Sequence, residues 1–468
     1  MPSTSVRLEA EGAEITAALA AITKDLPRSF PAEVQAEADA IAAIGPLPEL
    51  DRADVEFVTI DPLGSTDLDQ ALHLAREADG YRVLYAIADV PAFVEPGGAM
   101  DAEARLRGQT IYAPDGRIPL HPAVISEGAA SLLPGQLRGA FVWDLELDAD
   151  ANVTRATVYR ARVQSCEQLD YATAQKRLDD GTASEVLQLL REVGLKRIAL
   201  EQARGGASLG TQETEVSLVD GHYVLSRREP HPVEDWNAQL SLMTGMAAAR
   251  IMLDGGIGIL RTMPPADEEA VTRFRRQTQA LGTPWPASVR YGDYLRGLDT
   301  SEPRQRAIMH AAASLFRGAG YSAFDGAPPS HVEQAAVAAP YAHVTAPLRR
   351  LVDRFGLVVC EALEAGEPVP GWAREALPEL PSAMSRSSQI AGQVDSQALN
   401  VVEAAVLAGR EGEVFEATVL STSDGFGTVQ LADPPVVARC NGTLEAGETI
   451  SATLETASVE TGTVLFRA

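Results

Sequence analysis

The sequence predicts an α+β protein with three parts: a small helical N-terminal region, a central domain of mixed sheet and helices, and a C-terminal all-β barrel of the OB type. Three observations predict this division. Residues 6–46 are rich in Ala and Glu. Strand-like and then long helical segments follow from Val55, and only short strand-like segments follow Gly412. We place the domain boundaries at residues 1–50, 51–408 and 409–468.

Length and composition are those of a globular protein with a large core. The chain has 468 residues, of which 46% are hydrophobic and 22% charged. It contains no run of 18 apolar residues, so we expect no membrane span. The first residues are acidic and lack a basic start followed by an apolar stretch. They therefore do not resemble a signal peptide, and the cytoplasm is the expected location.

The N-terminal and central segments differ in periodicity. Pro27, Pro31 and the Gly45–Pro46 pair interrupt and close the helical composition of the N-terminal region. In the central domain, "VEFVTI" and "YRVLYAIADV" predict strands, and residues 141–163 predict two strands with a turn at Asp148–Asn152. Helices are predicted at 237–253, at 267–282, at 346–366 with Pro347 in the first turn, and at 381–408.

The C-terminal segment predicts five short strands separated by Gly, Asp and Pro turns: "EVFEATVLST", "GFGTVQLA", "PVVARCNGTL", "ETISATLETAS" and "GTVLFRA". Five strands in about 55 residues match the size of an OB barrel. An immunoglobulin-like sandwich needs about seven strands and a longer chain.

Three carboxylates crowd the stretch "TIDPLGSTDLDQAL" (59–72). Pro62 ends a strand-like run, so we expect Asp61 at a strand end. Asp67 and Asp69 are two residues apart and share one face of an extended loop. If the loop folds back, all three oxygens meet, and carboxylates are the preferred ligands of Mg²⁺ and Mn²⁺. The same spacing also occurs in solvated turns, where Asp stabilises loops and helix starts.

The charge pattern supports two interpretations. A net charge of −26 argues against a polyanionic partner. However, screening limits surface charges to about 10 Å, so a basic channel is compatible with an acidic surface. Lys24, Lys176 and Lys196 are the only lysines among 39 basic residues. Arginine suits a phosphodiester ligand because it binds phosphate bidentately, but genomic base composition also explains this bias.

Two motifs make the chain resemble the RNB family, the catalytic domain of ribonuclease II and ribonuclease R. "TIDPLGSTDLDQALHL" resembles the acidic motif of that family, and the likeness continues to about residue 140. "YAHVTAPLRRLVDRF" is similar to its Y-x-H-F-T-S-P-I-R-R-Y-x-D motif. The resemblance extends over roughly 55–408. It implies processive 3′-to-5′ hydrolysis of single-stranded RNA, or of RNA with a 3′ overhang, to nucleoside 5′-monophosphates, with Mg²⁺ (or Mn²⁺) as cofactor. We expect a monomer.

The resemblance also implies roles for individual residues. Asp61, Asp67 and Asp69 match three of the four family acids, and the fourth position holds Gln70, whose amide oxygen is a weaker metal ligand. Arg349 matches the arginine near the scissile phosphate, where it would stabilise developing charge; the alternative is a surface arginine. Tyr171 matches a tyrosine that stacks on a base; the alternative is a core tyrosine. Arg350 is a candidate phosphate contact.

The chain departs from the family pattern at its start. Relatives usually carry cold-shock domains there, whereas about 50 residues of helical composition stand in their place, for which a module of helix-turn-helix type is a candidate. Two other functions stay open beside the exoribonuclease. One is a catalytically weakened RNA-binding protein on the same fold, and the other is a phosphatase that uses the acidic loop.

Overall fold

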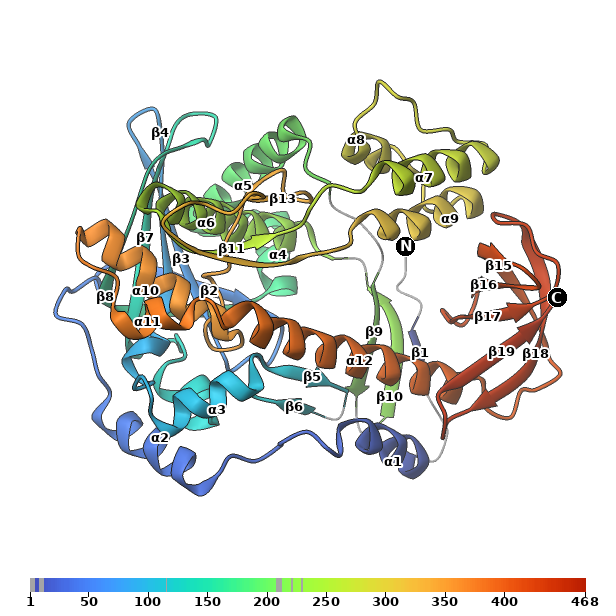
Figure 1. The fold of residues 1–468 in the computed structure, drawn as a ribbon, viewed down its shortest axis with the longest axis horizontal. Coiled ribbons are helices and arrows are strands. Elements are labelled where there is room, and N and C mark those ends of the chain that lie inside the picture. The colour runs from blue at the N-terminus through green and yellow to red at the C-terminus, as the bar shows by residue number, and fades with distance from the viewer. Residues whose placement is uncertain (1–4, 8–11, 115, 208–212, 220–221, 229) are drawn as a thin grey trace.

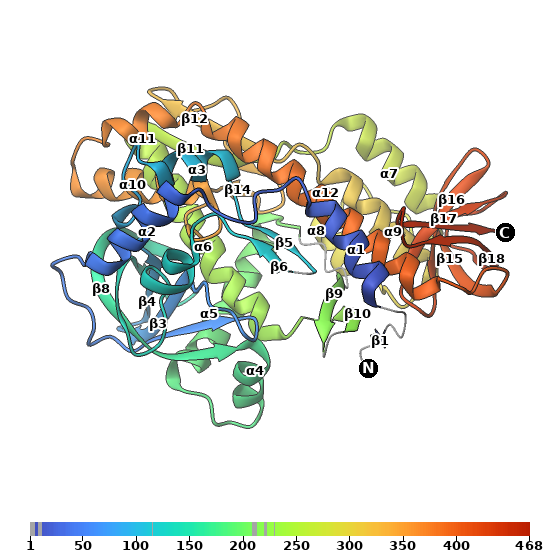
Figure 2. The same cartoon turned by 90° about the horizontal axis from the view of Figure 1, so that it is seen from below.

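Two closed barrels joined by a long helix organise the molecule (Figure 1). The computed structural model describes residues 5–7, 12–114, 116–207, 213–219, 222–228 and 230–468. Helix α12 (Leu380–Leu407) runs from the large barrel to the small C-terminal barrel in both views (Figures 1 and 2). The predicted α+β class, with N-terminal helices and a C-terminal barrel, is confirmed.

The large barrel consists of β2 (Phe57–Asp61), β3 (Gln70–Glu77), β4 (Gly80–Ala88), β7 (Leu137–Leu147) and β8 (Val153–Asp170). Neighbouring strands are antiparallel, except that β2 and β8 are parallel, and Asp61 lies opposite Asp170. Side chains of a strand alternate between its two faces. Strand β4 therefore contributes Val83, Tyr85 and Ile87 to one core and Leu84, Ala86 and Ala88 to another.

Helices cover the large barrel: α3 (Ala99–Arg107), α4 (Tyr171–Asp179), α5 (Glu185–Arg204), α6 (Pro232–Gly255), α10 (Leu351–Ala365) and α11 (Gly371–Ala376). Helix α6 is buried along much of its length, as its sequence predicts. At Gly245 an added Cβ would lie 2.2 Å from the Tyr341 ring and 2.6 Å from the Ala342 oxygen. This glycine therefore allows the segment before α10 to pack directly on α6.

The helix predicted at 346–366 starts later than expected. Helix α10 begins at Leu351, so Pro347 and Arg349 lie in a turn before it. The buried Asp353 carboxylate explains the difference: its Oδ1 accepts a hydrogen bond from the Ala346 N–H at 2.7 Å. It also accepts one from the Arg350 guanidinium at 2.8 Å. These bonds close the chain into a turn before the helix begins.

The two N-terminal helices pack on different parts of the molecule (Figures 1 and 2). Helix α1 (Gly12–Thr23) packs along α12, and its Ile15 and Leu19 join the core of the small barrel. Helix α2 (Ala32–Ile44) packs on α3, and its core side chains belong to the large barrel. The helical composition is as predicted. The packing on separate neighbours differs from a self-contained helix-turn-helix unit.

The small barrel contains the five predicted strands: β15 (Val414–Ser423), β16 (Phe426–Leu431), β17 (Val437–Asn441), β18 (Thr449–Ser458) and β19 (Thr463–Arg467). They close in the order β15-β16-β17-β19-β18, with β17 and β19 parallel. Phe415 and Phe466 meet edge to face at 5.7 Å in its core. Side chains of α12 complete this core, so the barrel is packed onto the long helix.

Shorter elements connect these bodies. Helices α7 (Glu268–Ala280), α8 (Tyr291–Arg296) and α9 (Pro303–Ala312) form a module around Phe274 that packs on β15. The remaining strands are β1 (Ser5–Arg7), β5 (Ile111–Ala113), β6 (Gly116–Ile118), β9 (Glu213–Val219), β10 (His222–Arg228), β11 (Ile257–Thr262), β12 (Gly320–Asp325), β13 (Glu333–Gln334) and β14 (Ala339–Pro340). Within the described part of the chain, no helix is long and apolar enough to cross a membrane.

Glu403 of α12 makes the docking of the small barrel sensitive to pH. It is buried, and its Oε1 accepts a hydrogen bond from the Val437 N–H of β17 at 2.9 Å. Burial raises the pKa of Glu403 to about 7. Because the folded-state pKa lies above the unfolded one, the protonated form stabilises the fold, and stability falls as the pH rises from about 4.5 to about 7.

We predict that Glu403→Gln stabilises the protein by about 1–3 kcal/mol at pH 8.5 and much less at pH 5. The amide keeps an acceptor for the Val437 N–H but carries no charge to desolvate. Thermal unfolding of the two proteins at both pH values measures the effect. An equal difference in Tm at pH 5 and pH 8.5 would contradict it.

Candidate active site

A polar cavity of about 720 Å³ opens at the ends of β2 and β8. It gathers six residues that the sequence predicts for the site: Asp61, Asp67, Asp69, Gln70, Tyr171 and Arg349. Its other lining residues are Ile60, Pro62, Leu63, Gly64, Ser65, Tyr112, Ala113, Gly116 and Arg117. Asp61 and Arg349, which are more than 280 positions apart in the sequence, thus line the same cavity.

Asp61 ends β2, because Pro62 follows it and takes the chain out of the sheet. Its Oδ2 atom is buried and has no hydrogen-bond partner among the described residues. Burial, with the charge of Asp67 nearby, raises the pKa of Asp61 to about 7. A buried carboxylate oxygen without a protein partner needs a proton, a cation or an ordered water.

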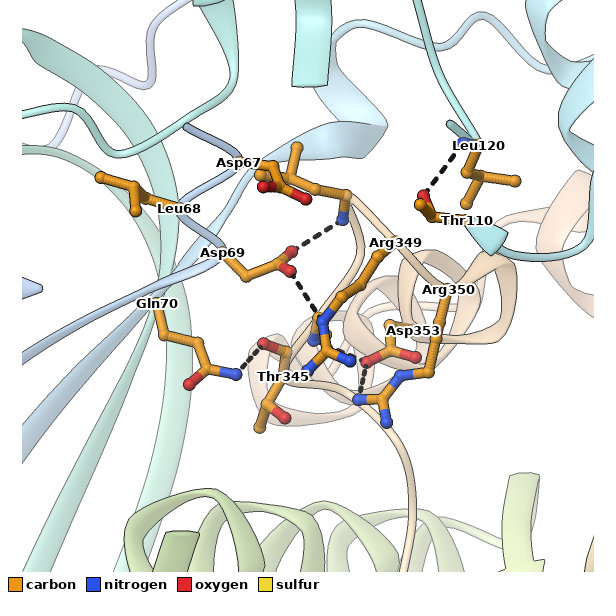
Figure 3. A network of polar contacts seen from close by, with 12 residues as sticks. Asp67, Leu68, Asp69, Gln70, Thr110, Leu120, Thr345, Arg349, Arg350 and Asp353 are labelled. Atoms are coloured by element: carbon orange, nitrogen blue, oxygen red, sulfur yellow. Dashed lines mark hydrogen bonds and ion pairs between the residues drawn. The ribbon is translucent and has the colours of Figure 1, made fainter. Parts of the chain in front are cut away.

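Asp69 joins the acidic loop to the turn before α10 (Figure 3). It is 4% exposed. Its Oδ1 accepts a hydrogen bond from the Leu348 N–H at 2.7 Å, and its Oδ2 lies 3.4 Å from Nε of Arg349. Burial raises the pKa of Asp69 to about 8 in spite of this arginine. The Asp69 carboxyl therefore holds the turn in place, and its ionised form lowers the stability of the fold because the charge is buried.

Asp67 is held by a hairpin that the sequence reasoning missed. Its Oδ1 is 2.7 Å from Nη1 of Arg117 in β6, and its Oδ2 accepts a 3.3 Å hydrogen bond from the Tyr112 hydroxyl in β5. The other amine of Arg117 lies 2.7 Å from Glu127. The sequence "YAPDGRI" carried a signal for this hairpin, since Asp-Gly between strand-like residues favours a tight turn. It did not indicate which loop the hairpin would meet.

Gln70 contacts three separate segments. Its Nε2 donates a hydrogen bond to the Thr345 carbonyl oxygen at 2.7 Å. Its Oε1 accepts one from the Tyr85 hydroxyl at 2.5 Å and a longer one, 3.4 Å, from Ser241. The predicted metal-ligand role relied on this same oxygen.

The two arginines of the predicted motif have different carboxylate partners, Asp69 for Arg349 and Asp353 for Arg350 (Figure 3). Arg349 lines the cavity, and its side chain is 43% exposed. Arg350 turns to Asp353 at 2.8 Å and is mostly buried. The structure therefore does not bring Arg350 into the cavity, because the buried Asp353 carboxylate binds its guanidinium. Its predicted phosphate contact has no support in this arrangement.

Tyr171 stands at the first position of α4. Asp170 caps this helix by accepting a 2.8 Å hydrogen bond from the Thr173 N–H. Because Asp170 pairs with Asp61 across β2 and β8, the cap brings the tyrosine next to the acids. Burial and the Asp61 charge raise the pKa of Tyr171. Its ring is half-buried and lines the cavity.

The donor chemistry of the cavity fits a divalent cation, although its side chains form no ready-made cage. Among the described residues, no group of three or more His, Cys, Asp and Glu side chains lies close enough to hold a metal ion. Asp67 and Asp69 each face an arginine, as the side chains stand. The unpartnered oxygen of Asp61, whose pKa is raised by burial and by the charge of Asp67, nevertheless marks a place that favours positive charge.

Comparison with known families agrees with this architecture. Residues 50–363 match the RNB domain, and residues 413–468 match the C-terminal S1 domain of RNase II-type exonucleases. The pair defines the class: a large catalytic-type barrel domain followed by a small S1 barrel. With more than half of its length matched to the RNB domain, the chain belongs to the RNB family. The resemblance that the two motifs predicted is confirmed.

Individual relatives share the fold at low sequence identity. Ribonuclease R of Thermotoga maritima is 26% identical over 436 residues, which cover 85% of this chain and 59% of that protein. RNase R of Mycoplasma genitalium, solved with ribose-methylated single-stranded RNA, has a TM-score of 0.85 at 16% identity over 97% of this chain and 78% of that chain. Yeast Ssd1, a pseudonuclease, has a TM-score of 0.71 at 19% identity over 87% of this chain and 51% of that chain.

We predict that Asp69→Asn stabilises the protein at alkaline pH. The folded-state pKa of about 8 lies above the unfolded value of 3.8, so the wild type loses stability as the pH rises through this range. The amide keeps an acceptor for the Leu348 N–H without the buried charge. We expect a gain of about 1–3 kcal/mol at pH 9 in EDTA, and little change at pH 4, close to the unfolded pKa.

Thermal unfolding at both pH values measures this gain. The exposed Asp54→Asn is the matched control, for which no pH-dependent difference is expected. If Asp69→Asn is less stable than the wild type at pH 9, the buried charge of Asp69 does not destabilise the fold, and this prediction is wrong.

Proposed function

We propose that the chain is a processive 3′-to-5′ exoribonuclease that hydrolyses single-stranded RNA, or a 3′ overhang, to nucleoside 5′-monophosphates. One observation carries the proposal: Asp61, Asp69 and Arg349 face the same cavity in a member of the RNB family. Buried carboxylates beside an arginine are an arrangement suited to phosphoryl chemistry, which depends on positioning and charge stabilisation.

The reaction adds water to the phosphorus of the last phosphodiester. The bond between phosphorus and the 3′-oxygen of the preceding nucleotide breaks, and that oxygen takes up a proton. The products are a nucleoside 5′-monophosphate and an RNA one nucleotide shorter with a 3′-hydroxyl. Arg349 would donate to the phosphate oxygens as charge develops, because its half-exposed guanidinium lines the cavity beside Asp69.

Asp61, Asp67 and Asp69 would hold Mg²⁺ or Mn²⁺. When bound, such an ion lowers the pKa of a water molecule bound to it and stabilises the negative charge of the phosphate. Asp61 supports this assignment because its buried Oδ2 has no partner in the described structure. Asp67 and Asp69 support it through their position on the same cavity, where the negative phosphate would compete for Arg117 and Arg349.

Tyr171 would stack on a base close to the reacting phosphate. The ring lies at the cavity and packs against the core of the large barrel, so little side-chain entropy is lost on stacking. Stacking on an aromatic ring tolerates every base, as degradation of mixed sequences requires. The C-terminal barrel would add RNA contacts, because OB-type barrels bind oligonucleotides on their strand faces.

We expect Tyr171→Ala to weaken RNA binding by roughly 1–3 kcal/mol, and Tyr171→Phe to keep most of the affinity. Fluorescence anisotropy with a short single-stranded RNA, in EDTA to prevent hydrolysis, measures both variants. Equal affinities of the Ala variant and the wild type would remove Tyr171 from the RNA-binding site.

The function itself is tested with RNA that carries a 5′ label and a 3′ overhang. With Mg²⁺ we expect a ladder that shortens from the 3′ end, together with nucleoside 5′-monophosphates. The ladder should vanish in EDTA and with Asp69→Asn, and the thermal unfolding experiment checks that this variant is folded. Internal cuts, or release of nucleotides that is insensitive to both changes, would refute the proposal.

A second candidate is an RNA-binding protein of the same fold without hydrolysis. Two observations favour it: an amide at position 70, and the likeness in fold to a pseudonuclease. The same assay separates the two functions, because this candidate binds the labelled RNA in Mg²⁺ and leaves its length unchanged.

A further inference from the structure

Gln70 lies where the barrel, α6 and the turn before α10 meet, and its amide bonds to all three (Figure 3 shows its bond to Thr345). Tyr85 comes from β4, Ser241 from α6 and Thr345 from the turn. Tyr85 is fully buried and Thr345 is 3% exposed, so water does not replace these partners.

The hydrogen-bond inventory of an amide matches these partners. An amide oxygen has two lone pairs, and hydroxyls face both: Tyr85 at 2.5 Å and Ser241 at 3.4 Å. The Tyr85 and Ser241 hydroxyls are also 2.8 Å apart, so the three groups form one network. Metal ligation by Gln70 would have to compete with the fully buried Tyr85 hydroxyl, which donates to the same oxygen at 2.5 Å. The amide therefore does not fit as a fourth metal ligand beside the three aspartates.

The amide nitrogen explains why this position holds Gln in this chain. The Thr345 carbonyl oxygen lies 2.7 Å from Nε2 and needs a donor, because it is buried. A carboxylate at position 70 would place an acceptor against that carbonyl, and the two oxygens would repel. An amide supplies the donor. The chemistry at this position is therefore set by a backbone group of the turn.

The turn that Gln70 holds is the one that presents Arg349. The Thr345 oxygen is fixed by Gln70, the Ala346 N–H by Asp353, and the Leu348 N–H by Asp69. Gln70 and Asp69 are adjacent in sequence. The start of β3 therefore hydrogen-bonds to the turn at two residues that lie three positions apart, Thr345 and Leu348. These hydrogen bonds hold the backbone on the N-terminal side of Arg349 in one position, and so fix the point from which its side chain extends.

We infer that Gln70 is a positioning residue that sets Arg349 against the scissile phosphate, and that it is no metal ligand. The inference depends on the proposed function, because it assigns Arg349 to the reaction. It predicts that loss of the amide loosens residues 345–349 and slows the chemical step without weakening cation binding.

The experiment compares the wild type with Gln70→Met, which keeps the length of the side chain and removes both polar groups. Four quantities are measured: hydrogen exchange of peptides covering 343–351, Mn²⁺ affinity by electron paramagnetic resonance, and kcat and KM on labelled RNA. Gln188→Met is the matched control, since Gln188 also donates to a backbone carbonyl but lies exposed on α5.

We expect faster exchange in 343–351, Mn²⁺ affinity within twofold of the wild type, and a kcat that falls about tenfold to a hundredfold with little change in KM. Tyr85→Phe removes one donor to the amide. It should also speed exchange in 343–351 and lower kcat, but by less than Gln70→Met does. Gln70→Glu should also lower kcat, because its carboxylate faces the Thr345 oxygen.

A Gln70→Met protein with Mn²⁺ affinity reduced tenfold or more would overturn the inference, and so would unchanged exchange in 343–351. A higher kcat in Gln70→Glu would do the same. If the wild type releases no nucleotides, the proposed function fails, and the exchange and Mn²⁺ measurements still decide the role of Gln70. Exchange is followed across the whole chain, so a variant that unfolds is recognised by its loss of protection outside 343–351.

Discussion

The site depends on one contact, the hydrogen bond from the Leu348 N–H to the buried Asp69 carboxylate, with Arg349 beside it. It joins two segments about 280 residues apart in the sequence. On one side is the acidic loop between β2 and β3, and on the other is the turn before α10. Burial of a carboxylate is unfavourable unless donors and positive charge surround it. The fold supplies both, and in doing so brings the acids and Arg349 into one cavity.

The charges in the cavity are mostly paired, although the whole chain carries an excess of negative charge. The protein carries a net charge of −26, which repels polyanions at long range. Inside the cavity, Asp67 pairs with Arg117, and Asp69 lies beside Arg349. Asp61 makes no ion pair in the described structure, and its buried Oδ2 lacks a partner. A negatively charged phosphate would therefore meet arginines, while the unpaired carboxylate would favour a cation.

Much of the fold followed from local patterns. The strands at 57–61 and 80–88, the buried helix at 232–255 and the five C-terminal strands each have a periodicity or turn residues that predict them. The error at the start of α10 comes from side-chain hydrogen bonds to the turn that precedes it, from Asp353 within the segment and from the distant Asp69. Pro347 looks like a first-turn proline, but the buried Asp353 binds the Ala346 N–H and Arg350 and ends the turn at Leu351. No pattern within that segment reveals those bonds.

In the candidate site, too, local sequence patterns predict some residues, and long-range packing alone determines the others. The acidic motif and the arginine motif identified Asp61, Asp67, Asp69 and Arg349, which all line the cavity. Tyr112 and Arg117 were missed because their hairpin meets the acidic loop only through long-range packing, with Ile111 and Ile118 in contact with α12 side chains. Gln70 was identified, but its partners on β4, α6 and the turn before α10 lie far away in the sequence. Those partners, which only the fold brings together, indicate its role.

The central claim is that the acids, and Asp61 foremost, bind a cation next to the last phosphate of an RNA chain. It is tested most directly by the anomalous scattering of Mn²⁺ in crystals grown with a short RNA whose terminal linkage resists hydrolysis. We expect a Mn²⁺ peak at about 2.1 Å from an Asp61 oxygen, a typical ligand distance for a small hard cation, with the terminal phosphate between that peak and Arg349. Mn²⁺ bound away from Asp61, or a terminal phosphate outside the cavity, would contradict it.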